Sequence, residues 1–119
     1  MDKRYEQTML FDFYGELLTE HQRKVYEDAV YNDLSLSEIA EEQGISRQGV
    51  HDLIKRCTKI LQEYEAKLHL VERFTRAKKT VEEIERLAKV DADATDSSKR
   101  PEARLQEIET LTKELLLEL

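Results

Sequence analysis

Turn-forming residues are scarce in this chain of 119 residues, which holds three glycines and one proline. None of the glycines lies after residue 49. Sheets and hairpins need more turn residues than that, because their tight connections depend on glycine and proline. The composition therefore predicts an all-α fold.

The chain also lacks a second cysteine and any long apolar run. Cys57 stands alone, which excludes an internal disulfide and suits a reducing compartment. The N-terminal segment has no signal-peptide character, and no stretch approaches the roughly 20 apolar residues of a membrane span. We therefore expect a cytoplasmic protein that makes no contact with a membrane.

Residues that carry out catalysis or bind metals are not grouped in the sequence. There is no glycine-rich phosphate loop, no nucleophile with a paired base and no pair of carboxylates in an evident cleft. His21, His51 and His69 lie on separate segments without metal-ligand spacing. We expect no enzymatic activity, no metal, no cofactor and no small-molecule substrate.

Charge is unevenly distributed along the chain, although the net charge is −7. Residues 46–79 contain nine basic and four acidic side chains, a net charge of +5. The segments 1–45 and 80–119 carry net charges of −7 and −5. Local clustering matters more for the attraction of phosphate than the total does, so the basic segment is a candidate nucleic-acid surface. A solvated helix face remains the alternative.

Short-range signals predict where the first helices begin. Thr19 with Gln22, and Ser35 with Glu38, match capping boxes, in which two side chains satisfy the free amides of a first turn. Apolar residues at helical spacing predict an earlier helix over residues 5–18. Its apolar positions are Met9, Leu10, Phe13, Tyr14, Leu17 and Leu18.

The second half of the chain predicts long helices. From Arg47 to about Val90 nothing forces a break, and the apolar positions step by four and three as in a coiled coil. The register of that stripe then shifts, so we expect a bend within residues 66–80, with a new capping box at Thr80 as one option. Residues 91–100 have the composition of a polar linker. Pro101 suits the first turn of a last helix.

Residues 36–55 have the spacing that a helix-turn-helix needs. Ala40 is small where two helices would cross, Gly44 permits the tight turn, and Ile45 is expected to fill the corner between the helices. Ser46 would then cap the second helix. The shared apolar contact is predicted to involve Ile39, Val50 and Leu53.

The outward face of that second helix is the predicted DNA-binding site. Arg47 and Gln48 lie in its first turn, where recognition helices usually meet base edges. Arginine can pair with guanine and glutamine with adenine. Lys55, Arg56 and Lys59 lie further along and are expected to meet phosphates. The full predicted set is Ser46, Arg47, Gln48, His51, Lys55, Arg56 and Lys59.

Two residues on this helix depart from an ideal DNA-reading surface. Asp52 places a negative charge on the face that would approach phosphates. Gly49 lies inside the helix, where glycine costs about 1 kcal/mol relative to alanine. A missing side chain there would permit close approach of another backbone, from nucleic acid or from another helix.

These motifs resemble those of two related groups of proteins. Residues 18–61, with LTEHQR, LSEIA and GISR in this order, resemble the DNA-binding fourth region of bacterial sigma factors. FDFYGELLTEHQ, SLSEIAEEQGISRQGV and EYEAKLHLVERF resemble the YlxM family of small bacterial proteins. The resemblance covers nearly all of residues 1–80.

The resemblance implies a fold, a partner and a function. The fold class would be all-α, with a sigma-region-four-like tri- or tetra-helical helix-turn-helix domain over residues 1–65. A long helix and a helical extension for dimerisation or partner binding would occupy residues 66–119. The function would be that of a nucleic-acid-binding regulatory protein. Its partner would be double-stranded DNA, and it would be linked to the signal recognition particle pathway.

Two alternatives stay open at this point. The same helical unit can serve as a protein-binding surface, so the chain could be an interaction module for the signal-recognition-particle protein or its RNA. The apolar stripes of the C-terminal half would be exposed in a monomer, so they would dock on each other or on a second subunit. We therefore expect a homodimer.

Overall fold

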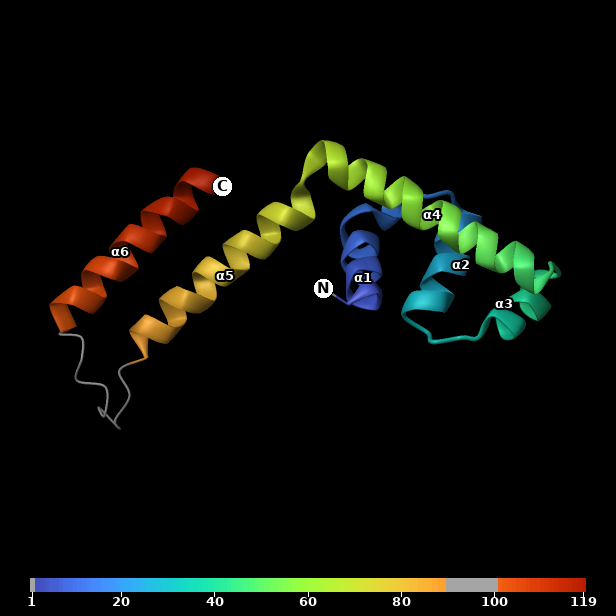
Figure 1. Cartoon of the computed structure of the whole chain (residues 1–119), viewed down its shortest axis with the longest axis horizontal. Helices are drawn as coiled ribbons and strands as arrows, with labels where there is room; N and C mark the ends of the chain where they lie inside the picture. The colour runs from blue at the N-terminus through green and yellow to red at the C-terminus, as the bar shows by residue number, and fades with distance from the viewer. Residues whose placement is uncertain (1, 90–100) are drawn as a thin grey trace. The chain divides into compact units, whose positions relative to one another are not determined.

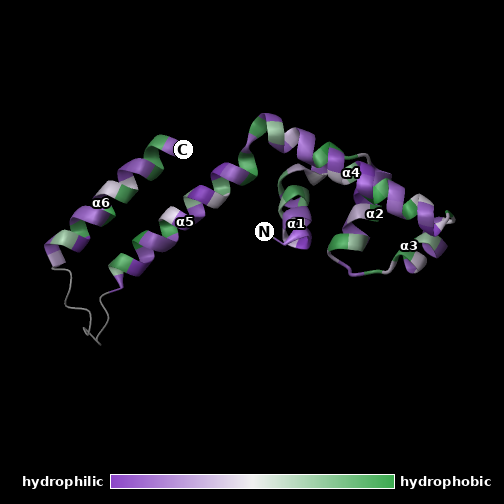
Figure 2. Cartoon of the chain, in the orientation of Figure 1, coloured by the Kyte–Doolittle hydropathy of each residue, from purple (hydrophilic) through white to green (hydrophobic). Residues whose placement is uncertain are grey.

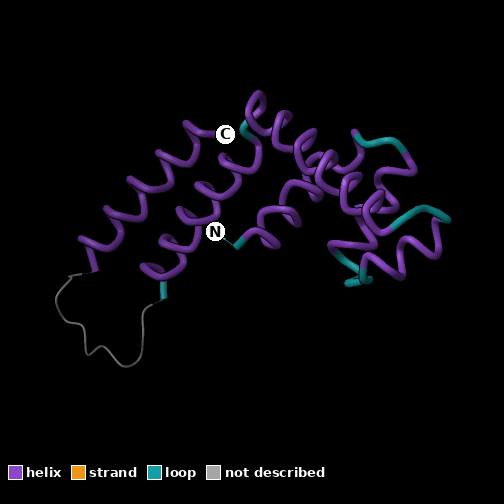
Figure 3. Tube along the Cα trace, turned by 45° about the vertical axis from the view of Figure 1, so that its right-hand side comes forward, coloured by secondary structure: helices purple, strands orange, loops and turns teal. Residues whose placement is uncertain are grey.

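The regular elements of the chain are helices, as a computed structural model of residues 2–89 and 101–119 shows (Figure 1). Coloured by element type, the described segments are helices joined by short loops, without a strand among them (Figure 3). The expected all-α class is confirmed. The elements are α1 (Lys3–Tyr14), the 3₁₀ turn η1 (Gly15–Leu17), α2 (Glu20–Val30), α3 (Leu36–Gln43), α4 (Arg47–Leu68), α5 (Leu70–Ala88) and α6 (Pro101–Glu118).

The chain divides into two compact units, Met1–Val71 and Glu72–Leu119. The first unit holds α1, η1, α2, α3 and α4, and the second holds most of α5 together with α6. Each unit has its own pattern of burial and is described separately below. The polar linker expected over residues 91–100 lies outside the described residues.

Both predicted capping boxes are present, at the starts of α2 and α3. The Gln22 amide donates to Thr19 Oγ1 at 3.2 Å, and the Thr19 amide donates to Gln22 Oε1 at 3.0 Å. Ser35 and Glu38 make the same reciprocal pair, with both bonds at 3.1 Å. Each box satisfies two amides that the first turn of a helix leaves free, which fixes where the helix begins.

The first helix is shorter than its apolar pattern predicts. α1 ends at Tyr14, and the chain continues as a 3₁₀ turn from Gly15. A Cβ on Gly15 would lie 2.9 Å from the Phe11 ring, so only glycine lets the turn close against that ring. The change of helix type rotates Leu17 outward, where it is 54% exposed, and the α-helix predicted to extend to residue 18 ends at Tyr14.

The core of the first unit is built around α4, which packs against α1, α2 and α3. Polar and apolar residues alternate along this helix, as Figure 2 shows. Its residues Val50, Cys57 and Leu61 are fully buried, and burial of each such side chain stabilises the fold by about 1.5–3 kcal/mol. Cys57 thus serves as a small apolar core residue, and burial raises the pKa of its thiol.

Two clusters make up this core. The first is closed by the aromatic residues of α1 and α2, and the second lies between α2, α3 and the start of α4. The buried members of the first are Leu10, Tyr14, Leu18, Tyr26, Val30, Cys57 and Leu61. Those of the second are Val25, Ile39, Ala40 and Val50.

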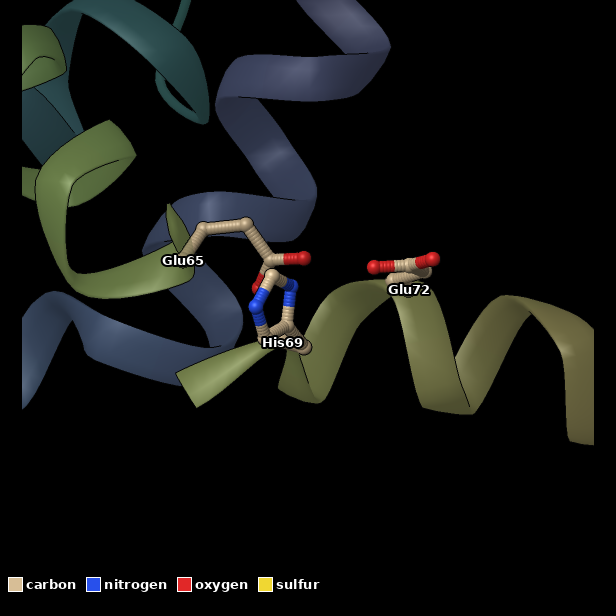
Figure 4. A group of neighbouring side chains, drawn as sticks. All are labelled: Glu65, His69 and Glu72. Carbon is tan, nitrogen blue, oxygen red and sulfur yellow. The ribbon is translucent and has the colours of Figure 1, made fainter. Parts of the chain in front are cut away.

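α4 ends at a left-handed residue that a hydrogen-bond network holds in place. His69 has φ 56° and lies within residues 66–80, the segment where the sequence predicts a bend. The Tyr14 hydroxyl donates to Glu65 Oε1 at 2.5 Å and accepts from the Leu70 amide at 3.1 Å. The same Glu65 oxygen accepts from the Val71 amide at 2.9 Å. Figure 4 shows Glu65 and His69 together at this end of the helix.

Thr80 does not start a helix, contrary to the option that the sequence offered. It lies in the middle of α5, and its hydroxyl donates to the Arg76 carbonyl at 3.1 Å. The hydroxyl therefore has a hydrogen-bond partner within its own unbroken helix. The chain turns at His69 instead. Pro101 does begin α6, as predicted, because the first turn of a helix needs no amide at that position.

The second unit buries little of its apolar surface. Of the residues described in α5 and α6, Leu87 alone is buried, at 5% exposure. None of the described helices combines the length and the apolar character that crossing a bilayer requires. The large apolar residues left exposed in this unit are Phe74, Val81, Leu105, Leu116, Leu117 and Leu119.

The Tyr14 network makes a prediction about stability. Tyr14→Phe removes two hydrogen bonds at the end of α4, so we expect the free energy of unfolding to fall by about 1–3 kcal/mol in urea denaturation. Tyr64→Phe is the matched control, because the Tyr64 ring stacks on Tyr14 at 6.1 Å and its hydroxyl makes no hydrogen bond with the described residues. An equal loss in both variants would contradict this role of the hydroxyl.

The same variant should change how stability depends on pH. Burial and the hydrogen bond to Glu65 raise the pKa of Tyr14 above 10.0, and burial raises that of Tyr26. The folded state therefore holds both phenol protons more tightly than the unfolded state does. Stability is fully present below pH 10 and is lost as pH rises through the folded pKa values. In Tyr14→Phe, the loss of stability at high pH should be smaller, because only the titration of Tyr26 still contributes to it.

Candidate nucleic-acid interface

The turn between α3 and α4 is built from a left-handed glycine and a serine cap. Gly44 has φ 69° at the end of α3, and the Ile45 amide donates to the Ala40 carbonyl at 3.1 Å. Ser46 then caps α4, its Oγ accepting from the Gly49 amide at 2.9 Å. The turn at Gly44 and the cap at Ser46 were both predicted, and together they present the first turn of α4 to solvent.

Ile45 does not fill the corner between the two helices. It is 39% exposed, so the expectation that it plugs the corner is wrong. The contact is made instead by Ile39, Ala40 and Val50, with Val25 of α2 completing the cluster. Ala40 is 7% exposed, which agrees with the need for a small residue where the helices cross.

Gly49 has a local explanation. A Cβ at this position would lie 3.1 Å from Ser46 Oγ and 3.9 Å from Ile45. The absence of a side chain therefore leaves room for the serine that caps α4. The space over Gly49 is taken up by its own neighbours and is not an opening for another backbone.

All seven residues of the predicted site are exposed. The side chains of six of them take no part in capping α4. Arg47, His51, Lys55 and Lys59 are spaced by four, so they follow one face of α4. Ser46 is the exception, because its oxygen is used in the N-cap. Ser46 could therefore contact a nucleic acid only by donating its hydroxyl proton. The exposed residues are Ser46, Arg47, Gln48, His51, Lys55, Arg56 and Lys59.

Asp52 is tied to the residues beside it. The Gln48 side-chain amide donates to Asp52 Oδ1 at 2.9 Å, and His51 Nδ1 lies 3.6 Å from the same oxygen. The carboxylate lies on the surface that carries the cations, as expected. It also restrains the Gln48 side chain through this hydrogen bond.

Cations of the first unit fall into two groups. Three of them form ion pairs, which are Arg4 with Asp33, Arg23 with Glu16, and Lys24 with Asp28. The others make no ion pair with any carboxylate in the described part of the chain. This second group comprises Lys3, Arg47, Lys55, Arg56, Lys59 and Lys67.

Four of these unpaired cations line one groove of about 1050 Å³ on the surface of the first unit. Arg47 lines a smaller hollow that shares Leu36 and His51 with the groove. Lys67 is the one unpaired cation of the described first unit that lies elsewhere. The lining of the groove comprises Lys3, Gln7, Leu36, His51, Asp52, Ile54, Lys55, Arg56, Thr58, Lys59 and Gln62.

The sequence does not reveal the wall that α1 contributes to this groove. Lys3 and Gln7 lie about fifty residues before the helix that they face, and nothing in their spacing marks them as part of a site. Gln62 was also missed, since it lies beyond the segment that matches a recognition helix. The predicted residues from His51 to Lys59 are brought together with these three.

A short helix, a turn at a left-handed glycine and a second helix with an exposed first turn define a helix-turn-helix protein. Comparison with known proteins gives the particular family. Residues 1–101 match the model of the UPF0122 family, described as "Putative helix-turn-helix protein, YlxM / p13 like". The chain belongs to this family, which confirms the resemblance to the YlxM family that the motifs indicated.

Three relatives illustrate the match, and two of them cover more than nine-tenths of the chain. A UPF0122 protein of Acetivibrio thermocellus is 42% identical over 114 residues, which cover 91% of this chain and 97% of the relative. One of Halalkalibacterium halodurans is 42% identical over 111 residues, covering 93% and 98%. One of Clostridium kluyveri is 54% identical over 84 residues, covering 70% and 71%.

Gly44 allows a test of how the turn is held. A Cβ at Gly44 would meet nothing within 4 Å, so Gly44→Ala should cost only the strain of a left-handed conformation, about 1–2 kcal/mol in urea denaturation. Gly44→Asn is the matched control and should lose less, because asparagine tolerates that conformation better. A loss in Gly44→Asn as large as in Gly44→Ala would argue against this explanation.

Proposed function

We propose that this protein is a regulator that binds double-stranded DNA through the exposed face of α4. The observation that carries the proposal is the gathering of unpaired cations on that face, while other cations of the first unit are neutralised by carboxylates. Phosphate attraction requires cations that are not already paired. Membership of a helix-turn-helix family supports the same conclusion.

The first turn of α4 supplies the side chains that read bases. Arg47 can donate two hydrogen bonds to guanine, and Gln48 can pair with adenine. Gln48 is steadied by Asp52, which limits the rotamers that must be ordered on binding. Lys55 lies eight residues after Arg47, about 12 Å along the helix axis, which suits contact with phosphates at the rim of the major groove.

Acidic groups restrict where nucleic acid can bind. Asp52 would repel a phosphate placed directly over it, but a carboxylate can accept a hydrogen bond from the amino group of cytosine. The net charge of −7 leaves the rest of the surface unfavourable for DNA. Binding is thereby confined to one face.

Dimerisation through the second unit is part of the proposal. α6 has no buried residue, and Leu116, Leu117 and Leu119 are more than half exposed. Contiguous apolar surface of this kind usually marks an interface. A second copy would cover it, and a two-fold dimer would present two recognition helices to neighbouring half-sites.

Binding to duplex DNA is tested by fluorescence anisotropy on random and genomic duplexes. Arg47→Ala combined with Lys55→Ala should weaken binding by about a hundredfold, because one base contact and one phosphate contact are lost. Affinity should fall steeply with salt. Lys67→Ala is the matched control, since this exposed and unpaired lysine of the same helix lies outside the groove.

The alternative partner enters the same experiment. Purified signal-recognition-particle protein and its RNA are presented at two salt concentrations beside the duplex. Retention of either one without any retention of duplex DNA would overturn the proposal. It would point to an interaction module of the signal recognition particle pathway.

The oligomeric state is tested by sedimentation at micromolar concentration, where we expect a dimer. Leu105→Glu combined with Leu116→Glu should give a monomer, because two buried charges would destabilise an apolar interface. Thr110→Glu adds one such charge on another side of α6 and should remain dimeric. A monomeric wild-type protein would contradict this part of the proposal.

A further inference from the structure

We propose that the groove between the first two turns of α1 and the middle of α4 holds the phosphodiester backbone of the bound nucleic acid. This groove is the one lined by Lys3, Gln7, Lys55, Lys59 and Gln62 among others. The inference rests on the proposed function and extends the interface from the helix-turn-helix to α1, which has no role in base reading.

Both walls of the groove carry groups that donate hydrogen bonds to phosphate. On α1, Lys3 and Gln7 are one turn apart, which places an ammonium and an amide on the same side of the helix. On α4, Lys55 and Lys59 are likewise one turn apart, and Gln62 follows. A strand lying between the walls would be contacted from two sides.

Gln7 is positioned by the floor of the groove. The Gln7 side-chain amide donates to Thr58 Oγ1 at 3.5 Å. Thr58 in turn donates to the Ile54 carbonyl at 3.0 Å, and its hydroxyl oxygen lies 2.9 Å from that of Tyr26. The Thr58 hydroxyl is therefore fixed from the core side, and Gln7 is held toward the groove with one amide hydrogen to spare.

The balance of charge in the groove is positive. Four cations face one carboxylate, Asp52, a net of +3 with His51 neutral. Glu6 lies next to this lining and accepts from the Gln62 amide at 3.3 Å, so one further carboxylate is close. Lys3 makes no ion pair with Glu6 or with any other carboxylate among residues 2–89 and 101–119. Its charge is therefore available to a phosphate.

The length of the groove fits a short run of phosphates. His51 and Gln62 are eleven residues apart, which is about 16 Å along the axis of α4. A groove of this length can follow more than one phosphate of a nucleic-acid strand. Arg47 and Gln48 line the adjoining hollow, which places base reading and backbone contact next to each other.

The test measures duplex affinity over a range of salt concentrations for the full-length protein and two single variants. Lys3→Gln should lower the slope of log affinity against log salt by about 1, which corresponds to a roughly eightfold loss at about 0.1 M salt. Lys67→Gln removes the same charge from an unpaired lysine outside the groove, and should match the wild type. Lys3 stands at the start of α1, where a cation is unfavourable, so its replacement does not threaten folding.

The outcomes separate this inference from the proposed function. If the wild type binds duplex DNA and loses binding on Arg47→Ala with Lys55→Ala, while Lys3→Gln matches the wild type, the groove inference is overturned and the function stands. If the wild type binds neither duplex DNA nor duplex RNA, both fall. An equal effect of Lys3→Gln on duplex RNA would support the groove as a site for the backbone of either nucleic acid.

Discussion

The interface depends on one constraint, which is that α4 is buried along a single face. Val50, Cys57 and Leu61 are fully enclosed by α1, α2 and α3. Since residues three and four apart share a face of a helix, fixing these three inward turns His51, Lys55 and their neighbours outward. The surface that we assign to nucleic acid is thus a geometric consequence of the core. A substitution that rotated α4 about its own axis would move every candidate contact residue on this helix at once.

Electrostatics sharpen what packing defines. A helix face that is merely solvated usually carries mixed charges that pair along the helix. In the first unit, the pairs of Arg4, Arg23 and Lys24 lie off the face that α4 exposes, and the cations of the groove keep their charge. Folding would gain little from such pairs at the surface, about 0–1 kcal/mol each. Leaving these cations unpaired therefore costs the fold little and retains their attraction for phosphate.

Local signals could be predicted from the sequence, and long-range contacts could not. The two capping boxes, the serine cap of α4 and the left-handed Gly44 each depend on residues at most four apart, and all four are present. The break at His69 has no such local signal, because Tyr14, more than fifty residues away, holds it through Glu65. The α1 wall of the groove was missed for the same reason. The prediction of a helix start at Thr80 was wrong because the residue pattern of a capping box also occurs inside uninterrupted helices.

The two units satisfy the demand to bury apolar surface in different ways. The first unit encloses its aromatic and aliphatic residues in two clusters of its own, and Tyr14 and Glu65 close the end of its longest helix from within. The second unit buries Leu87 and leaves Leu105, Leu116 and Leu117 of α6 exposed to water. A helix with exposed leucines and no core of its own gains stability chiefly from packing against another surface, since most helical stability in proteins comes from tertiary packing. The fold therefore accounts for the apolar residues of the first unit, whereas the exposed leucines of α6 are the reason why we propose a second copy of the chain as their partner.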